Sequence, residues 1–241
     1  MLRLLRLALG LLTVFPLAPR EASPEDFRRS TLFFPLAGYA LGLPLSLLAL
    51  LPLPEGFLAA LLLACLLLLT GFLHLDGLLD AADALLGSRP RAERLRILKD
   101  PHLGPFAFGV GGLYLLLLWQ ALALVRDPLF LLFLPGFARF AILPFLNRYP
   151  LLHQGMAGLI RGGPVWGAFL LALPFPLLYP WSALLTLFTA YLVARFALAR
   201  LGGINGDVLG AMIALGEEQR APSEILRAGL PGSQGKDGKK A

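Results

Sequence analysis

Long apolar stretches dominate this sequence and limit it to folds that a lipid bilayer can hold. Six stretches are long and apolar enough to cross a membrane as helices, at about residues 31–53, 57–73, 105–125, 129–146, 165–180 and 181–199. Only 15% of the 241 residues are charged, against about 25% in soluble domains, so polar groups cannot cover a globular surface. We predict an all-α, polytopic integral membrane bundle with about six transmembrane helices.

The two ends of the chain differ in character from these spans. Residues 1–19 combine two arginines with a proline-interrupted apolar stretch, and no small-residue cleavage site follows. We therefore expect a retained interfacial or re-entrant helix there. A short apolar helix is expected after the glycine-rich turn at 202–206. Residues 1–218 are predicted to form a single transmembrane catalytic domain, and the polar residues 219–241 a disordered tail.

Three aspartates stand close together in this apolar context, at Asp76, Asp80 and Asp83. If the segment is helical, steps of four and three residues place all three on one side, which we call the aspartate stripe. Like charges repel there and lose hydration at a membrane edge, so a divalent cation is the simplest compensation. Oxygen ligands without His or Cys pairs favour Mg²⁺ or Mn²⁺ over Zn²⁺. The alternative is a solvated helix end after a span.

The distribution of basic residues indicates which polar segments share a side of the membrane. Residues 84–104 hold the densest basic cluster, which by the positive-inside rule predicts a cytoplasmic loop. Counting crossings from there places the aspartate stripe, the Lys99-Asp100 pair and the segment from Asn205 to Asp207 on the same face. Polar groups from separate segments are thus expected to meet in one cytoplasmic pocket.

Three further residues have both a functional and a structural interpretation. Arg139 lies near the middle of a predicted span, where it is either a phosphate clamp or the partner of an acidic residue in helix packing. Asp207 either belongs to the polar pocket or caps the helix that it begins. His74 is the one histidine that adjoins the aspartate stripe, and such a histidine is more often structural than catalytic.

Several classes of function are disfavoured by the remaining sequence. In a membrane protein, a net charge of +6 usually reflects basic cytoplasmic loops that lie against anionic lipid headgroups. No aromatic-and-basic module indicates nucleic-acid binding. Cys65 is the only cysteine, so no internal disulfide forms. The glycines at 202–206 lack the Lys-Ser/Thr of a nucleotide-binding loop.

A series of motifs carries a resemblance to a known family. FPLAG with Gly42, HLDGLLDAAD, LKDPHLG and GDVLGA follow one another at residues 34–42, 74–83, 98–104 and 206–211. The series resembles cobalamin synthase, the adenosylcobinamide-GDP ribazoletransferase of bacteria and archaea, over about residues 1–217. The sequence departs from the family where a common glutamate is replaced by Ala214, and Arg139 has neighbours that differ from the usual Ser-Arg-Trp.

The resemblance implies a Mg²⁺-dependent transferase that joins α-ribazole, or its 5′-phosphate, to adenosylcobinamide-GDP and releases GMP. It also implies a bacterial inner-membrane protein whose active site faces the cytoplasm. Further expected partners are membrane lipids, and a homo-oligomer is left open as an alternative to a monomer. We hypothesise catalytic roles for Asp76, Asp80, Asp83 and Asp207, with the first three as metal ligands. The substrate-binding candidates are His74, Gly77, Lys99, Asp100, Arg139 and Asn205.

Two other classes of membrane protein compete with this interpretation. A CDP-alcohol phosphatidyltransferase also uses several aspartates around a metal, but its motif opens Asp-Gly-x-x-Ala-Arg, whereas Asp76-Gly77 is followed by Leu-Leu-Asp-Ala. A cation or proton-coupled transporter would more often carry repeated halves and broken helices at mid-membrane. The sequence shows neither feature.

Overall fold

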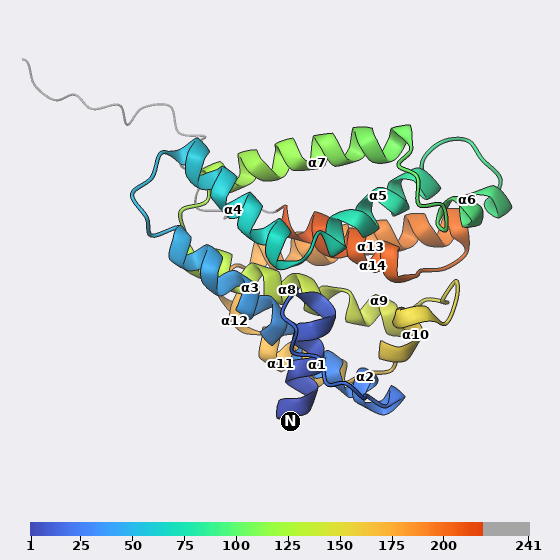
Figure 1. The fold of residues 1–241 in the computed structure, drawn as a ribbon, viewed down its shortest axis with the longest axis horizontal. Coiled ribbons are helices and arrows are strands. Elements are labelled where there is room, and N and C mark those ends of the chain that lie inside the picture. Colours follow the sequence, from blue (N-terminus) through green and yellow to red (C-terminus); the bar gives the residue numbers. More distant parts are fainter. Residues whose placement is uncertain (219–241) are drawn as a thin grey trace, which may run out of the picture.

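The computed structural model describes residues 1–218, and this part of the chain is helical with one isolated β-bridge (Figure 1). The predicted all-α membrane architecture is confirmed, and the predicted tail at 219–241 lies outside the described residues. The helices are α1 (Leu2–Leu12), α2 (Pro24–Ser30), the 3₁₀ helix η1 (Thr31–Phe33), α3 (Phe34–Leu48), α4 (Glu55–Leu69), α5 (Leu73–Leu85), α6 (Arg91–Ile97), α7 (Pro105–Leu124), α8 (Pro128–Ala141), α9 (Leu143–Arg148), α10 (Gly155–Ile160), α11 (Val165–Ala172), α12 (Pro174–Leu178), α13 (Pro180–Leu201) and α14 (Gly206–Glu217).

Four helical segments in the described chain are long and apolar enough to span a membrane: 24–48, 105–124, 128–148 and 180–201. The number rises to five if α4 and α5, which are bent by 86°, count as one span. The predicted span at 165–180 differs, because Pro174 divides it into the short helices α11 and α12. Neither piece reaches the length of about 20 residues that a bilayer requires.

The bend between α4 and α5 has a local cause. The hydroxyl of Thr70 donates to the carbonyls of Leu66 and Leu67 at the end of α4. Gly71 and Phe72 then take left-handed backbone conformations, with φ of 58° and 60°. A left-handed phenylalanine is uncommon and strained, so surrounding contacts must hold this turn in place. The bend directs α5, with its aspartates, away from the line of α4.

Glycines bring two pairs of helices together. A Cβ atom on Gly38 of α3 would lie 2.4 Å from the Cα of Gly136 in α8, and one on Gly42 would lie 2.2 Å from the carbonyl oxygen of Leu132. Small residues four apart, Gly38 and Gly42, thus allow close approach of α3 and α8, as such pairs do in other membrane helices. In the second pair, a Cβ on Gly77 of α5 would lie 2.9 Å from the carbonyl oxygen of Asp207 in α14.

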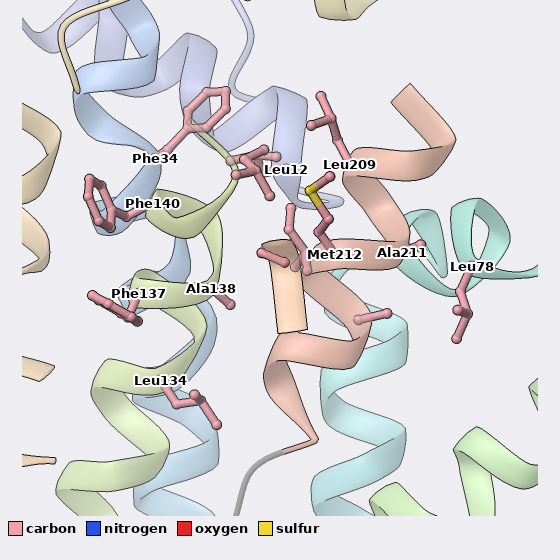
Figure 2. Packing of buried hydrophobic residues seen from close by; sticks show 14 of the residues in the cluster. Leu12, Phe34, Leu78, Leu134, Phe137, Ala138, Phe140, Leu209, Ala211 and Met212 are labelled. Carbon is pink, nitrogen blue, oxygen red and sulfur yellow. The ribbon is translucent and has the colours of Figure 1, made fainter. Parts of the chain in front are cut away.

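The apolar core lies between the α3–α8 pair and the α5–α14 pair and packs against both. Figure 2 shows Leu134, Phe137 and Phe140 of α8 on one side, and Leu209 and Met212 of α14 nearby. Dispersion contacts among such closely packed side chains favour association of the helices, because lipid tails are as apolar as the core and provide no hydrophobic driving force. At one end of the molecule lie the α5–α6–α7 connection, the loop after α9 and the turn into α14 (Figure 1). These are the segments that carry the predicted polar residues.

Candidate active site

Four carboxylates from two helices gather at this end of the structure. The stripe is helical as predicted, since Asp76, Asp80 and Asp83 all lie on α5. Asp80 interacts electrostatically with Asp76, Asp83 and also Asp207 of α14. Because the glycine contact between α5 and α14 brings the two backbones together, it unites residues that lie more than a hundred positions apart in the sequence.

No lysine or arginine of residues 1–218 forms an ion pair with this acidic cluster, although the charge of His153 acts on Asp207. Within residues 1–218, none of the ion pairs includes Asp76, Asp80, Asp83 or Asp207. The same range holds no group of three His, Cys, Asp or Glu residues arranged around one metal position. Mg²⁺ is often held by only one or two carboxylates, together with water and substrate phosphates. Carboxylate oxygens are ligands of the kind that Mg²⁺ takes, and Mg²⁺ binding at this cluster remains a prediction.

Asp207 is held by its neighbour rather than acting as a helix cap. The N-cap of α14 is Asn205, whose side-chain oxygen accepts a hydrogen bond from the backbone N–H of Val208 at 3.2 Å. The amide nitrogen of Asn205 donates to Asp207 Oδ2 at 2.7 Å. Burial raises the pKa of Asp207 above its usual value, against the Asn205 hydrogen bond, and the negative charge of Asp76 adds to the rise.

A neighbouring loop fixes the position of Asn205. The backbone N–H of Leu152 donates to the carbonyl of Ile204 at 2.9 Å, and the N–H of Ile204 donates to the carbonyl of Pro150 at 2.9 Å. These two bonds form the isolated bridge between the loop after α9 and the turn before α14. Asn205, a predicted substrate-binding residue, is thus buried and serves to orient Asp207.

Asp83 differs from the other aspartates of the stripe. Its carboxylate accepts hydrogen bonds from the backbone N–H groups of Gly104 at 2.7 Å and Ala107 at 2.9 Å, so it caps the start of α7. A Cβ atom on Gly104 would lie only 2.5 Å from Asp83 Oδ1, which explains the glycine. Both carboxylate oxygens of Asp83 are engaged here, and metal binding by this residue remains a prediction.

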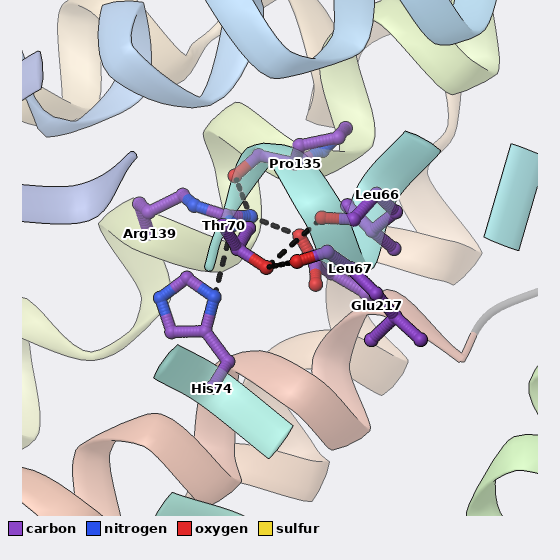
Figure 3. A network of polar contacts seen from close by, with 7 residues as sticks. All are labelled: Leu66, Leu67, Thr70, His74, Pro135, Arg139 and Glu217. Carbon is purple, nitrogen blue, oxygen red and sulfur yellow. Dashed lines mark hydrogen bonds and ion pairs between the residues drawn. The ribbon is translucent and has the colours of Figure 1, made fainter. Parts of the chain in front are cut away.

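Arg139 lies at the centre of a buried polar network (Figure 3). It has no exposed surface, forms an ion pair with Glu217 of α14 and donates to the carbonyl of Pro135 at 3.0 Å. Its Nη2 atom also lies 3.2 Å from Nδ1 of His74. Of the two interpretations of Arg139, this geometry has the features of the packing ion pair, and contact with phosphate remains a prediction.

Glu217 is the residue of this network that the sequence interpretation missed. It lies 78 residues from Arg139, immediately before the chain turns polar, and no local pattern marks it. The available signal was Ala214, which stands where the resembled family commonly has a glutamate. Glu217 lies three residues later, close to one helical turn along α14.

The remaining candidates lie apart from the cluster or act through the backbone. Lys99 and Asp100 are exposed in the loop between α6 and α7, and within residues 1–218 neither hydrogen-bonds to the four carboxylates. Asp100 instead pairs with His102, whose hydrogen bond lowers the pKa of the Asp100 carboxyl. Gly77 is the point at which α5 passes the backbone of α14.

A cavity of about 360 Å³ adjoins the acidic cluster. Its walls come from α1, α3, α5, α10, α14 and the junction of α8 and α9. Three of its lining residues carry polar side chains, namely His74, Asp76 and Asp207, and the rest are apolar residues or glycines. The site therefore combines hard oxygen ligands with an apolar recess of the size of a small-molecule pocket.

Comparison with known proteins places this arrangement in a family. A model of the family described as cobalamin-5-phosphate synthase matches residues 4–218. An adenosylcobinamide-GDP ribazoletransferase of Deinococcus radiodurans is 45% identical over 88% of this chain and 82% of its own length. Two proteins of the same name are also similar. The one from Desulfitobacterium hafniense is 37% identical over 90% of this chain and 94% of its own length. The one from Pseudomonas aeruginosa is 40% identical over 90% of this chain and 95% of its own length. No solved structure matches. The chain belongs to the cobalamin-5-phosphate synthase family.

Proposed function

We propose that the protein catalyses the ribazole transfer after which its relatives are named. In this reaction the acceptor is α-ribazole or α-ribazole 5′-phosphate. A hydroxyl oxygen of the acceptor attacks the phosphorus next to the cobinamide group of adenosylcobinamide-GDP. A new P–O bond forms, the pyrophosphate P–O bond breaks, and GMP leaves with the bonding electrons. The observation that carries the proposal is the cluster of four carboxylates at the contact of α5 and α14, none of which has an ion-pair partner within residues 1–218.

The residues divide the work according to their surroundings. Asp76 and Asp80 lie four residues apart on α5 and would hold Mg²⁺ together with the pyrophosphate. Bound there, the ion would neutralise charge on the pyrophosphate and on departing GMP. Asp207 would accept the hydroxyl proton, because its raised pKa makes it a stronger base than an ordinary aspartate. Asn205 orients that carboxylate.

Surrounding elements would position these groups. Asp83 fixes the entry of α7 relative to α5, and each of its oxygens keeps a second lone pair with which it would bind a metal. The exposed Lys99 would contact phosphate oxygens from the loop after α6. Arg139 would act from within the core by holding His74 and Glu217 in place.

The membrane setting also belongs to the proposal. We infer that the polar end of the molecule faces the bacterial cytoplasm, because the basic loop at 84–104 lies at that end. Exposed side chains such as Phe108, Leu116 and Trp166 would contact lipid. A corrinoid substrate would then approach the carboxylates from the aqueous side.

A turnover assay tests the function. Purified protein in nanodiscs would receive adenosylcobinamide-GDP, α-ribazole phosphate and Mg²⁺, and chromatography would follow GMP and the new corrinoid. Product that appears with Mg²⁺ and disappears with EDTA supports the proposal. Release of CMP from a CDP-lipid plus alcohol, without corrinoid turnover, would transfer the protein to the phosphatidyltransferase class. Folded protein that releases neither GMP nor CMP from these substrate pairs would favour a transporter.

A further inference from the structure

The protonation state of His74 follows from its partner. The guanidinium of Arg139 has only donors, so the contact at 3.2 Å makes Nδ1 of His74 the acceptor (Figure 3). A ring nitrogen that accepts a hydrogen bond carries no proton. The imidazole is therefore neutral, and its single N–H group is at Nε2.

That N–H group has no acceptor within the described chain. Only 4% of His74 is exposed, and Nε2 is buried without a hydrogen-bond partner in residues 1–218. Buried donors are almost always paired, because loss of hydration without a replacement bond is unfavourable. Arg139 Nε is likewise without a partner in residues 1–218, but of these two residues His74 alone lines the cavity, so a ligand in the cavity can supply the acceptor that Nε2 lacks.

The cavity lined by His74 defines the chemistry of that ligand. Its apolar wall includes Leu12, Ile142 and Met156, while Asp76 and Asp207 are its other polar side chains. The two carboxylates can accept hydrogen bonds from hydroxyl groups of a ligand. A fitting ligand part is uncharged, largely apolar, and carries one acceptor beside a hydroxyl-bearing group.

We infer that this cavity binds the base of the ribazole, and that His74 Nε2–H donates to its free ring nitrogen. A dimethylbenzimidazole is planar, neutral and apolar, with one unsubstituted imine nitrogen, and its ribose carries the hydroxyls. An acyl chain would fill apolar space but would leave the His74 donor unpaired. This inference rests on the proposed function and adds to it the position and recognition of the acceptor substrate.

The placement has a mechanistic consequence. Asp76 and Asp207 line the same cavity as His74, so a base that reaches His74 carries its ribose toward the carboxylates. The attacking hydroxyl would then lie beside Asp207, the proposed proton acceptor. His74 is a binding residue in this scheme and does not exchange a proton with the reacting atoms.

Equilibrium binding without corrinoid tests the inference independently of turnover. Detergent-purified wild-type protein would be titrated with the dimethylbenzimidazole riboside and with the matching dimethylindole riboside, in which the imine nitrogen is replaced by C–H. We expect the benzimidazole compound to bind about five- to tenfold more tightly, the usual effect of one hydrogen bond. Equal affinities for the two compounds would overturn the role of His74.

Variants separate the donor from the fold. His74→Phe keeps an aromatic ring but loses the donor, and is expected to abolish the preference and raise the KM for ribazole about five- to tenfold, with the KM for adenosylcobinamide-GDP unchanged. Because His74→Phe also removes an Arg139 contact, Ala157→Leu is the second variant. It fills the cavity from α10 at a residue that takes no part in the hydrogen bonds of the network, and should weaken both ribosides.

The exposed His102→Phe is the matched control, and should change neither affinity. Unchanged riboside binding in Ala157→Leu would overturn the location, as would competition of long-chain lipid, but not of riboside, for the cavity. Failure of the proposed function is a different result: wild-type protein would bind the riboside and release no GMP.

Discussion

The contact between α3 and α8 and the contact between α5 and α14 use the same packing device for different ends. In each, a glycine on one helix meets backbone of the other, so that a single methyl group would collide. The first contact lies against a cluster of phenylalanines that includes Phe137 and Phe140, whereas the second carries Asp76, Asp80 and Asp207. Close packing serves cohesion in one place and brings like charges together in the other.

Glycine-mediated close packing of two helices therefore does not determine which side chains lie at the contact. Repulsion among carboxylates opposes the α5–α14 contact, so apolar burial elsewhere on α14 must hold it closed. Leu209, Met212 and Ile213 are almost fully buried and provide that burial. The buried network of Arg139, His74 and Glu217 joins the two regions, because it links α8 to both α5 and α14. The predictions below test this division.

The largest expected effect is on the link between the regions. Glu217→Leu leaves the guanidinium of Arg139 buried without its counter-ion and is expected to destabilise the protein by about 3–5 kcal/mol. The measurement is denaturant-induced unfolding in detergent micelles. The double variant Arg139→Met/Glu217→Leu is the control, and should recover much of the loss since both charges are gone. Equal stability of the single and double variants would contradict the pairing.

Removing a carboxylate from the α5–α14 contact should affect activity without loss of stability. Asp76→Asn is expected to lower kcat by about 100-fold or more, because a proposed metal ligand is lost. The melting temperature should stay constant or rise, since repulsion within the cluster decreases. Glu55→Gln, an exposed carboxylate change at the start of α4, is the matched control and should retain wild-type rates. A near-wild-type rate for Asp76→Asn would remove it from the site.

Matched glycine substitutions compare the two contacts directly. Gly42→Ala places a methyl group against backbone of α8 and is expected to destabilise by about 1–3 kcal/mol while activity per folded molecule persists. Gly77→Ala places a methyl group 2.9 Å from the carbonyl oxygen of Asp207 and should lower kcat about tenfold through displaced carboxylates. Thermal unfolding and turnover of both variants give the result. If both variants lost stability and kcat to the same extent, the two contacts would not differ in function.

A smaller effect is expected at the start of α14. Asn205→Ala removes the N-cap and should destabilise by about 1 kcal/mol. It also frees Asp207 from its hydrogen bond, so kcat should fall further than the stability loss explains. Asn205→Asp would restore the cap but not the amide donor, and separates the two roles. Recovery of full activity in Asn205→Asp would show that capping alone matters.

The smallest effect concerns the pH dependence of stability. The pKa of Asp207 is raised in the folded protein, so the folded state binds this proton more tightly than the unfolded chain. Its contribution is present at low pH and is lost as the pH rises through the folded pKa. The melting temperature of wild-type protein should therefore fall more than that of Asp207→Asn between mildly acidic and neutral pH. Parallel profiles would argue against a raised pKa.

Hydrophobic pattern and local spacing predicted much of this molecule. Span-length apolar runs gave the helical membrane class, and spacings of four and three placed Asp76, Asp80 and Asp83 along α5. Long-range contacts were beyond such reasoning. The capping of α7 by Asp83 joins residues more than 20 positions apart, and the partner of Arg139 is 78 positions away. Nor did hydropathy reveal that Pro174 divides a predicted span, because apolar content is insensitive to helix continuity.

The α3–α8 contact also bears on how copies of this chain could associate. Small residues spaced four apart are a common basis for pairing between membrane helices of separate molecules. Here Gly38 and Gly42 already pack within one chain, since the backbone of α8 at Gly136 and Leu132 lies directly against them. These glycines are thus unavailable as a dimer interface. Any homo-oligomer would have to form through other lipid-facing surfaces of the molecule, such as the face of α7 where Gly109 and Gly112 are exposed.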